Sequence, residues 1–328
     1  MMNMWKAVIV LTIAGCTGGS GIPLAPSLQG TGADALYYIY VGAESADLLH
    51  RIRFGPTGME LDQTTPVGEM AVETEGPHGL NVSPDGDHLY MTTAHGVPDG
   101  KLWKFHAGPD TLVAPPILLG NFPATLDLTP DGLYAFIVNF NLHGEHVPST
   151  VSVVYTPDLV EVDQIPTCTM PHGLRMANDG LFVYSNCMMD DQLVEIDTRT
   201  FEVSRRFSVT TGSEAALLDY QVGEVVTGAS GITKPLESLS NRTATEPTCS
   251  PTWAQPTPDG HSIFVACNKS NEILVIDREK WTLERNISVP GGPYNLAISD
   301  DGKILVASLK GAGKVQFFEA STGKSLGL

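Results

Sequence analysis

The chain has 328 residues, a formal net charge of −18 and 42% hydrophobic residues, so it is long and apolar enough to bury a substantial core. Its Lys and Arg residues form no cluster, and an acidic chain without one is not expected to bind nucleic acid or to dock electrostatically on anionic lipid headgroups. Gly 33 and Pro 23, with only 17% charged residues, provide the many turns that an all-β repeat needs.

The N-terminus carries a targeting pattern. Lys6 precedes a short apolar run at 7–13, which is too short to span a bilayer and is typical of a signal peptide. The segment Ile13-Ala14-Gly15-Cys16 resembles the bacterial lipobox, and the resemblance implies a signal peptide at 1–15 and lipid attachment at Cys16. An ordinary cleaved signal with an incidental cysteine is the alternative. Both predict export, and the first predicts a lipid anchor facing the periplasm or the cell surface, followed by a flexible tether at 16–33.

A repeated pattern occupies residues 34–328. Each copy has a short run that begins with proline, an Asp-Gly turn and then a β-rich run. The Asp residues of the five clear turns are Asp85, Asp131, Asp179, Asp259 and Asp301. Their steps are 46, 48, 80 and 42 positions, so we interpret the step of 80 as two units with a degenerate copy near Asp219, and we add an upstream copy at Asp34. Units of this length with about four short strands are typical of β-propeller blades. We predict one all-β domain at 34–328, a seven-bladed β-propeller of four-stranded antiparallel blades; six or eight blades would follow if the copy at Asp34 or Asp219 is misread.

In chain order the blades are predicted at 35–75, 76–121, 122–168, 169–214, about 215–248, 249–290 and 293–328. The fifth is the weakest, because Gly228–Thr248 is rich in Ser and Thr and shows little alternation. We interpret that stretch as a long loop over one face, and loops of this length are often functional or disordered.

Two blades carry motifs of a known repeat family. Tyr184-Ser185-Asn186-Cys187 precedes Ile196-Asp197-Thr198, and Phe264-Val265-Ala266-Cys267-Asn268 precedes Ile276-Asp277. With the preceding proline and Asp-Gly elements, these resemble the YVTN repeat of YncE-like β-propellers over about five blades, although the YVTN tetrapeptide itself is absent. The resemblance implies the fold rather than an activity, since similar propellers include surface-layer proteins, lactonase-like proteins and carriers of quinone or haem d1 chemistry.

Four cysteines occupy equivalent places in two blades. Cys168 and Cys249 lie just before an innermost strand, and Cys187 and Cys267 end the strand that follows. Because the start of one strand faces the end of the next in an antiparallel hairpin, we predict two intrablade disulfides, Cys168–Cys187 and Cys249–Cys267, in an oxidising compartment. The competing interpretation is that Cys187 is a thiolate copper ligand beside Met188.

Candidate site residues gather where the innermost strands begin and in the loops after the second strands, at the predicted mouth of the central channel. The possible metal ligands are His78, His95, His143, His146, His172 and Met188. Imidazole with thioether suits copper, and His78 and His172 could approach across the channel. The alternative is that each Pro-His-Gly histidine bonds backbone at the channel wall. The same mouth is predicted to contain Trp253, Tyr294, Asp190 and Asp191.

Two functions follow. The first is a monomeric binding or scaffold lipoprotein whose propeller face holds a protein, peptide or small-molecule ligand at the cell envelope. The second is a metal-dependent enzyme, either a copper-type oxidoreductase or a lactonase-like hydrolase with Glu145, Asp190 or Asp191 as acid or base. The chain has no GxSxG elbow, phosphate-binding loop, dinucleotide fingerprint or CxxCH haem attachment.

Overall fold

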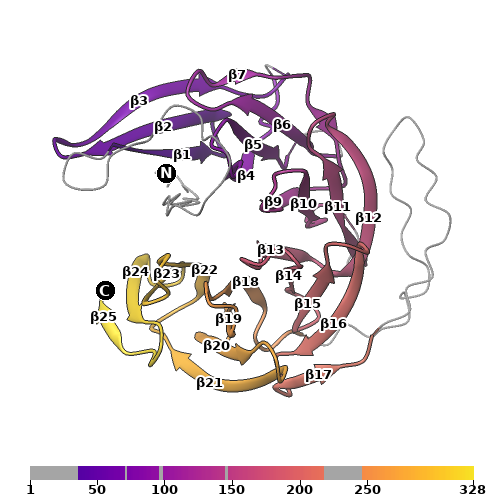
Figure 1. The fold of residues 1–328 in the computed structure, drawn as a ribbon, viewed down its shortest axis with the longest axis vertical. Coiled ribbons are helices and arrows are strands. Elements are labelled where there is room, and N and C mark those ends of the chain that lie inside the picture. Colours follow the sequence, from indigo (N-terminus) through magenta and orange to yellow (C-terminus); the bar gives the residue numbers. More distant parts are fainter. Residues whose placement is uncertain (1–35, 71, 96–98, 145–146, 218–245) are drawn as a thin grey trace. The chain divides into compact units, whose positions relative to one another are not determined.

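The computed structural model describes residues 36–70, 72–95, 99–144, 147–217 and 246–328 (Figure 1). The chain forms two compact units, one ending at Thr125 and one comprising Leu126–Leu328. The predicted signal peptide, lipidation site Cys16 and tether lie outside the described residues. In the described ranges no helix is long and apolar enough to cross a membrane.

The first unit contains two antiparallel sheets, which we name blades A and B. Blade A has the order β1-β2-β3, with β1 (Tyr37–Ala43), β2 (Leu48–Gly55) and β3 (Gly58–Pro66). Blade B has the order β4-β5-β6-β7, and β8 also pairs with β6; the strands are β4 (Pro77–Val82), β5 (His88–Thr93), β6 (Lys101–His106), β7 (Thr111–Leu112) and β8 (Ile117–Leu118).

Blades C and D follow. Blade C contains β9 (Pro123–Leu128), β10 (Tyr134–Asn139), β11 (Pro148–Tyr155) and β12 (Val160–Thr169). Blade D contains five strands in chain order, β13 (Pro171–Met176), β14 (Phe182–Cys187), β15 (Gln192–Asp197), β16 (Glu202–Ser208) and β17 (Ser213–Ala215).

The last two blades each have four strands. Blade E contains β18 (Pro251–Pro256), β19 (Ser262–Cys267), β20 (Glu272–Asp277) and β21 (Thr282–Ser288). Blade F contains β22 (Pro293–Ile298), β23 (Ile304–Leu309), β24 (Lys314–Glu319) and β25 (Ser325–Gly327). The fold is therefore an all-β β-propeller with antiparallel blades, as predicted, and blades C, E and F have the predicted four strands.

The predicted number of blades was wrong, because the described chain forms six sheets rather than seven. The extra copy had been placed near Asp219, which lies outside the described residues. Blade E packs directly on blade D, since the Trp281 indole N–H donates to the Arg206 carbonyl at 2.9 Å and Leu283 N donates to Gly212 O at 3.0 Å. No blade fits between two sheets that share these hydrogen bonds, so the step of 80 positions is one blade plus an insertion.

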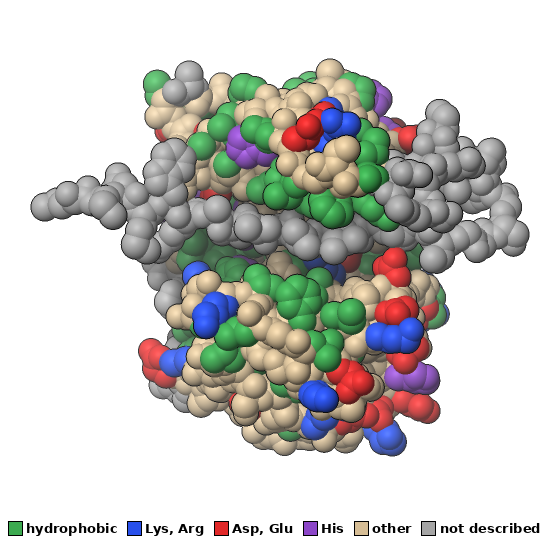
Figure 2. Space-filling view, turned by 90° about the vertical axis from the view of Figure 1, so that its left-hand side faces the viewer, with side chains coloured by type: hydrophobic (Ala, Val, Ile, Leu, Met, Phe, Trp, Pro, Cys, Tyr) green, Lys and Arg blue, Asp and Glu red, His purple; other side chains and the backbone are tan. Residues whose placement is uncertain are grey.

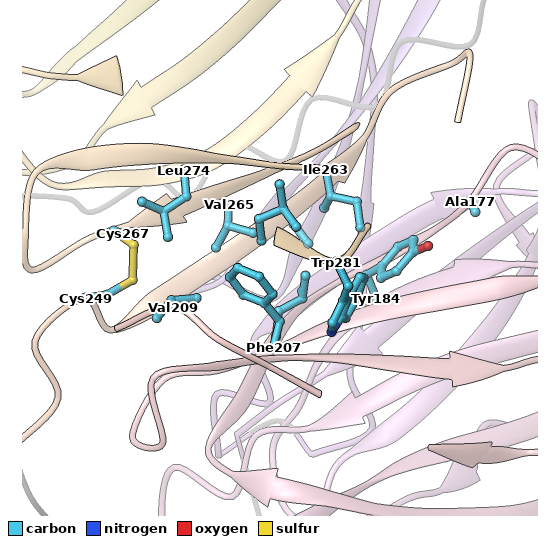
Figure 3. Packing of buried hydrophobic residues seen from close by; sticks show 13 residues of the cluster. Ala177, Tyr184, Phe207, Val209, Cys249, Ile263, Val265, Cys267, Leu274 and Trp281 are labelled. Carbon is cyan, nitrogen blue, oxygen red and sulfur yellow. A yellow bond between two sulfur atoms is a disulfide. The ribbon is translucent and has the colours of Figure 1, made fainter. Parts of the chain in front are cut away.

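A common core joins blades D and E (Figure 3). Trp281 is fully buried, with its ring 6.3 Å from that of Tyr184 and 5.8 Å from that of Phe207. Truncating a buried aromatic of this kind costs about 3–5 kcal/mol. Val265 and Ile263 of β19 face the same cluster, and the Cys249–Cys267 disulfide lies at its side. Blades D and E thus each cover an apolar face of the other.

Charges are scattered over the face drawn in Figure 2, where Lys and Arg side chains alternate with Asp and Glu instead of forming one basic area. Many basic groups are paired with carboxylates, as in Arg278–Asp179 at 2.7 Å and Lys303–Asp301 at 2.9 Å. This distribution agrees with the prediction that nucleic acid is not a partner, which stays a prediction.

Candidate functional site at the proline ends of the blades

The innermost strands share a register that places the candidate residues. In blades B, D, E and F the first residue is a proline that pairs with the last residue of the second strand, in the pairs Pro77–Thr93, Pro171–Cys187, Pro251–Cys267 and Pro293–Leu309. A β-bulge follows each of these prolines. Because a bulge re-aims side chains, the residue after the proline is turned out of the sheet. We call this end of a blade its proline end and the opposite end its Asp-Gly end.

Side chains at the end of the second strand hold these bulges. Thr92 Oγ1 accepts a hydrogen bond from Gly79 N at 2.8 Å, and Ser308 Oγ accepts one from Asn295 N at 3.0 Å. In blade D the Asn186 amide donates to Gly173 O at 3.3 Å. Polar residues therefore occur near the end of these otherwise apolar strands because their side chains form the hydrogen bonds that hold the bulges.

His172 is the most constrained of the predicted site residues. It is 1% exposed, its Nδ1 lies 3.1 Å from Thr252 O and its Nε2 lies 2.8 Å from the Tyr294 hydroxyl. A carbonyl can only accept, so Nδ1 carries the proton; with the ring neutral, Nε2 accepts the hydrogen bond that Tyr294 donates. The ring edges of Phe140 and Tyr294 flank the imidazole at 4.9 and 5.2 Å. Both nitrogens are thus engaged in positioning neighbouring groups.

His78 repeats part of this arrangement in blade B. Its Nδ1 donates to Ala124 O at 2.7 Å, at the same register position as the bond from His172 to Thr252. His78 is half-buried, and its ring lies 5.2 Å from that of Phe122. His95 contacts the same Phe122 ring at 4.9 Å, and its Nε2 lies 2.9 Å from a Glu44 carboxylate oxygen. The structure therefore brings His78 and His95 together around one phenylalanine.

Thr252 and Tyr294 continue the same series of contacts. The Thr252 hydroxyl donates to Tyr294 O at 2.8 Å, so in blades B, D and E the residue after the proline bonds the equivalent carbonyl of the next blade. Glycine follows His172 because a Cβ at Gly173 would lie 2.2 Å from Thr252 O. The Pro-His-Gly motif thus links neighbouring blades. Its histidines bond backbone carbonyls, as the alternative to metal binding predicted.

Both predicted disulfides are confirmed. Cys168–Cys187 and Cys249–Cys267 have S–S distances of 2.06 and 2.00 Å, and all four cysteines are buried. The interpretation of Cys187 as a thiolate copper ligand was wrong, because its sulfur is bonded to Cys168. Cys249–Cys267 lies within blade E, as predicted, but the prediction of an intrablade bond was wrong for Cys168–Cys187, because Cys168 belongs to β12 of blade C and Cys187 to β14 of blade D. Both bonds reinforce the proline ends of blades D and E.

Asp191 fixes the chain that enters blade E. Its backbone has a φ of 50°, a left-handed conformation that Asp tolerates, and its side chain is buried. The carboxylate accepts hydrogen bonds from Thr248 N, Cys249 N and Ser250 N at 2.6, 3.2 and 2.8 Å. Its neighbour Asp190 accepts one from Thr169 N at 2.8 Å. These carboxylates organise backbone, which differs from the predicted acid or base of a hydrolase.

The other predicted mouth residues have distinct surroundings. Tyr294 is half-buried and carries the Lys310 ammonium over its ring at 4.6 Å from the centroid. Trp253 is 2% exposed and belongs to the core between blades E and F. Met188 is half-buried, and its backbone N–H donates to Met170 O at 3.1 Å.

The metal site stays a prediction. Within the described ranges, no three His, Cys, Asp or Glu side chains gather as a protein metal site would require. His143 is exposed, while Glu145 and His146 lie outside the described residues. The predicted approach of His78 to His172 also stays a prediction, as does copper.

A surface cavity of about 470 Å³ opens elsewhere, at the Asp-Gly ends of blades E and F. Pro258, Arg285 and Asp300 are among its lining residues, and none of the predicted site residues lines it. The cavity is therefore separate from the proline ends.

Sequence reasoning missed Phe140 and Arg175. Phe140 follows β10 directly, and nothing in its sequence context indicates a contact with His172. Arg175 lies three residues after His172, and its guanidinium stacks on Trp253 at 4.6 Å. The available signal was that Trp253 occupies the position after Thr252 where the Pro-His-Gly blades have glycine.

Comparison with known proteins supports the fold. No family model matches the chain, and no curated protein matches it in sequence. A functionally unknown protein from Desulfotomaculum acetoxidans is similar in structure, with a TM-score of 0.62 and 12% identity over 88% of this chain and 81% of that one. The YVTN family assignment stays a prediction.

Two further solved structures are similar. A streptogramin B lyase has a TM-score of 0.58 and 15% identity over 85% of this chain and 74% of that chain. Kuenenia stuttgartiensis hydrazine synthase has a TM-score of 0.51 and 14% identity over 86% of this chain and 92% of that chain. Likeness at this level of identity shows the β-propeller fold alone, because one fold hosts many functions.

Proposed function

We propose that this protein is an exported, lipid-anchored binding module at the cell envelope, and that its ligand surface lies at the proline ends of blades D, E and F. The observation that carries the proposal is the reinforcement of this region. Two disulfides, the Asp191 carboxylate and the bond between His172 and Tyr294 all fix backbone or side chains there. A rigid surface loses little conformational entropy on binding, so the arrangement favours recognition.

Tyr294 is the group that the site presents. His172 orients its hydroxyl, and the half-buried ring carries the Lys310 ammonium on one face. A fixed tyrosine beside a cation offers apolar area, a hydrogen-bonding group and charge in one place, as binding surfaces often do. The ligand class is a protein, peptide or small molecule, and the chain acts as a monomer with membrane contact only through its lipid.

Photo-cross-linking in the full-length chain tests the surface. A photoreactive residue at Ser270, which is exposed at a proline end, is expected to give a discrete adduct in the native envelope. The matched control is His261, which is exposed at the Asp-Gly end. The adduct should disappear in Tyr294→Leu and persist in Tyr294→Phe. Equal adducts at His261, or none that depend on Tyr294, contradict the proposal.

Anchoring is tested separately at Cys16. The full-length chain labelled with a radioactive fatty acid is expected to carry the label and to fractionate with membranes, whereas Cys16→Ser should lose the label. An unlabelled wild-type chain that is nevertheless exported would support the ordinary signal peptide instead.

A further inference from the structure

The junction of blades D and E contains an arginine held at an Asp-Gly end. Arg278 directly follows β20 of blade E, and its guanidinium donates to Asp179 Oδ2 of blade D at 2.7 Å. The same guanidinium lies over the rings of Phe182 and Tyr184, 5.4 and 5.9 Å from their centroids. A carboxylate and aromatic faces together suit a guanidinium, which is planar and charged. This junction therefore shows what a filled guanidinium site looks like in this fold.

The junction of blades E and F repeats these positions, but the arginine is missing. Ala320 corresponds to Arg278, because each residue directly follows the third strand of its blade, β24 or β20 (Figure 1). Each also donates its backbone N–H to the carbonyl of the second residue after the turn Asp, at 2.8 and 2.9 Å respectively. The residues of blade E that correspond to Asp179, Phe182 and Tyr184 are Asp259, Ser262 and Phe264.

The cavity of about 470 Å³ lies where the arginine is missing. Its lining includes all four corresponding residues, Asp259, Ser262, Phe264 and Ala320. Asp259 Oδ1 accepts hydrogen bonds from the Thr257 hydroxyl at 2.6 Å and from His261 N at 3.0 Å, and these bonds lower the pKa of Asp259. Asp259 Oδ2 corresponds to the oxygen of Asp179 that Arg278 bonds, and it has no partner in the described part of the chain. An ionised carboxylate therefore lines the cavity with one oxygen unused.

The charges of the lining favour a cation. Asp259, Asp300 and Asp301 line the cavity, and Arg285 is the single basic residue among the described lining residues. Lys303 balances Asp301 at 2.9 Å, and the Arg285 guanidinium donates to a backbone carbonyl of blade F at 2.9 Å. Three carboxylates thus face two cations, and neither Asp259 nor Asp300 has an ion pair among the described residues. An incoming cation gains a partner here, whereas an anion would be repelled.

From these correspondences we propose that the cavity binds a guanidinium group supplied from outside the chain, in the place that Arg278 takes between blades D and E. The planar group donates to Asp259 Oδ2 and packs against Phe264. An alkylammonium lacks both the flat face and the fork of donors, so it binds more weakly. Small arginine derivatives and the arginine side chains of peptides both carry this group. The site is independent of the ligand surface proposed at the proline ends.

The test uses the full-length chain with ¹³C-labelled alanine methyl groups and ethylguanidinium as the probe. The Ala320 methyl signal, assigned from its loss in Ala320→Ser, is expected to shift saturably at constant ionic strength. n-Butylammonium, which has the same charge, should bind about tenfold more weakly. A Gly-Arg-Gly peptide blocked at both ends distinguishes the two sources of the group. Binding as tight as that of ethylguanidinium indicates a peptide, and weaker binding indicates a small molecule.

Variants decide the assignment. Asp259→Asn should weaken ethylguanidinium binding about tenfold, as loss of a charge-assisted hydrogen bond does, while Asp85→Asn, at the same turn position in blade B, should leave it unchanged. Arg278→Ala empties the template site, so the methyl group that it introduces should also shift with ethylguanidinium. Circular dichroism reports whether each variant is folded. The proposal is overturned if the Ala320 shift does not saturate, if n-butylammonium binds equally well, or if Asp259→Asn binds as wild type does.

Discussion

Blades B and D begin with the same three residues, Pro-His-Gly, and the structure gives the two histidines different surroundings. Both donate from Nδ1 to the carbonyl of the next innermost strand. His172 is buried, bonded through Nε2 to Tyr294 and close to a disulfide, whereas half-buried His78 shares Phe122 with His95. The shared motif therefore fixes a backbone link, and the residues around it determine what else the imidazole does.

The largest expected effect comes from removing the two imidazoles. His172→Ala should lower the free energy of unfolding by about 4 kcal/mol, because it empties a buried site and leaves Thr252 O and the Tyr294 hydroxyl without their partner. His78→Ala should cost about 2 kcal/mol, since that ring is half-buried. Urea denaturation followed by tryptophan fluorescence measures both. Equal losses would show that burial does not distinguish the two sites.

The next effect concerns the disulfide that blade B lacks. The double variant Cys168→Ala with Cys187→Ala should lower the free energy of unfolding by about 3 kcal/mol, because the bond restricts the unfolded chain. Urea denaturation of the oxidised protein is the measurement. Thr93→Ser, at the position in β5 that corresponds to Cys187, keeps the hydroxyl that accepts the Trp103 indole N–H at 3.0 Å, so it is the control and should cost much less. A double variant as stable as wild type would show that the proline end of blade D is rigid without its bond.

The glycines that follow the two histidines test how closely the innermost strands of neighbouring blades approach each other. Gly173→Ala should cost about 3 kcal/mol, since the new Cβ would lie 2.2 Å from Thr252 O and the strands would have to separate. For Gly79→Ala, where the distance to Ala124 O is 2.7 Å, a loss of about 2 kcal/mol is expected. Gly311→Ala is the control, because its nearest neighbour is 3.4 Å away. Thermal unfolding of all three variants ranks their losses of stability. A Gly173→Ala variant as stable as wild type would contradict the close approach of Gly173 to Thr252 O.

The smallest effect is a pH dependence in blade B. Asp99 precedes β6 at the place where Asp190 precedes β15, but burial raises its pKa to about 6. Between pH 4 and 6 the folded state keeps a proton that the unfolded state has released, so raising the pH through this window removes stability. Asp99→Asn should therefore gain stability relative to wild type on going from pH 4 to pH 7, by about 1 kcal/mol. A constant difference across this range would show that Asp99 does not titrate there.

The sequence predicts the blades, their proline starts and the disulfide pairing, because these depend on a local repeat. It did not predict the number of blades, since an insertion between β17 and β18 has the length of a repeat. The bond between His172 and Tyr294 joins residues 122 positions apart, and the stack of Arg175 on Trp253 also crosses between blades. Such contacts depend on how sheets pack, which no spacing in one sequence encodes.

The position of the disulfides also bears on how the chain folds as it is made. Four cysteines can pair in three ways, yet each observed bond joins nearest neighbours in sequence, at separations of 19 and 18 residues. Short loops close faster and at lower entropic cost than long ones, and Cys187 and Cys249 are 62 positions apart. Each bond can therefore form once the chain up to its second cysteine, Cys187 or Cys267, has emerged, before the next blade is synthesised. The order of oxidation then follows the order of the chain, and mispairing between blades is disfavoured kinetically.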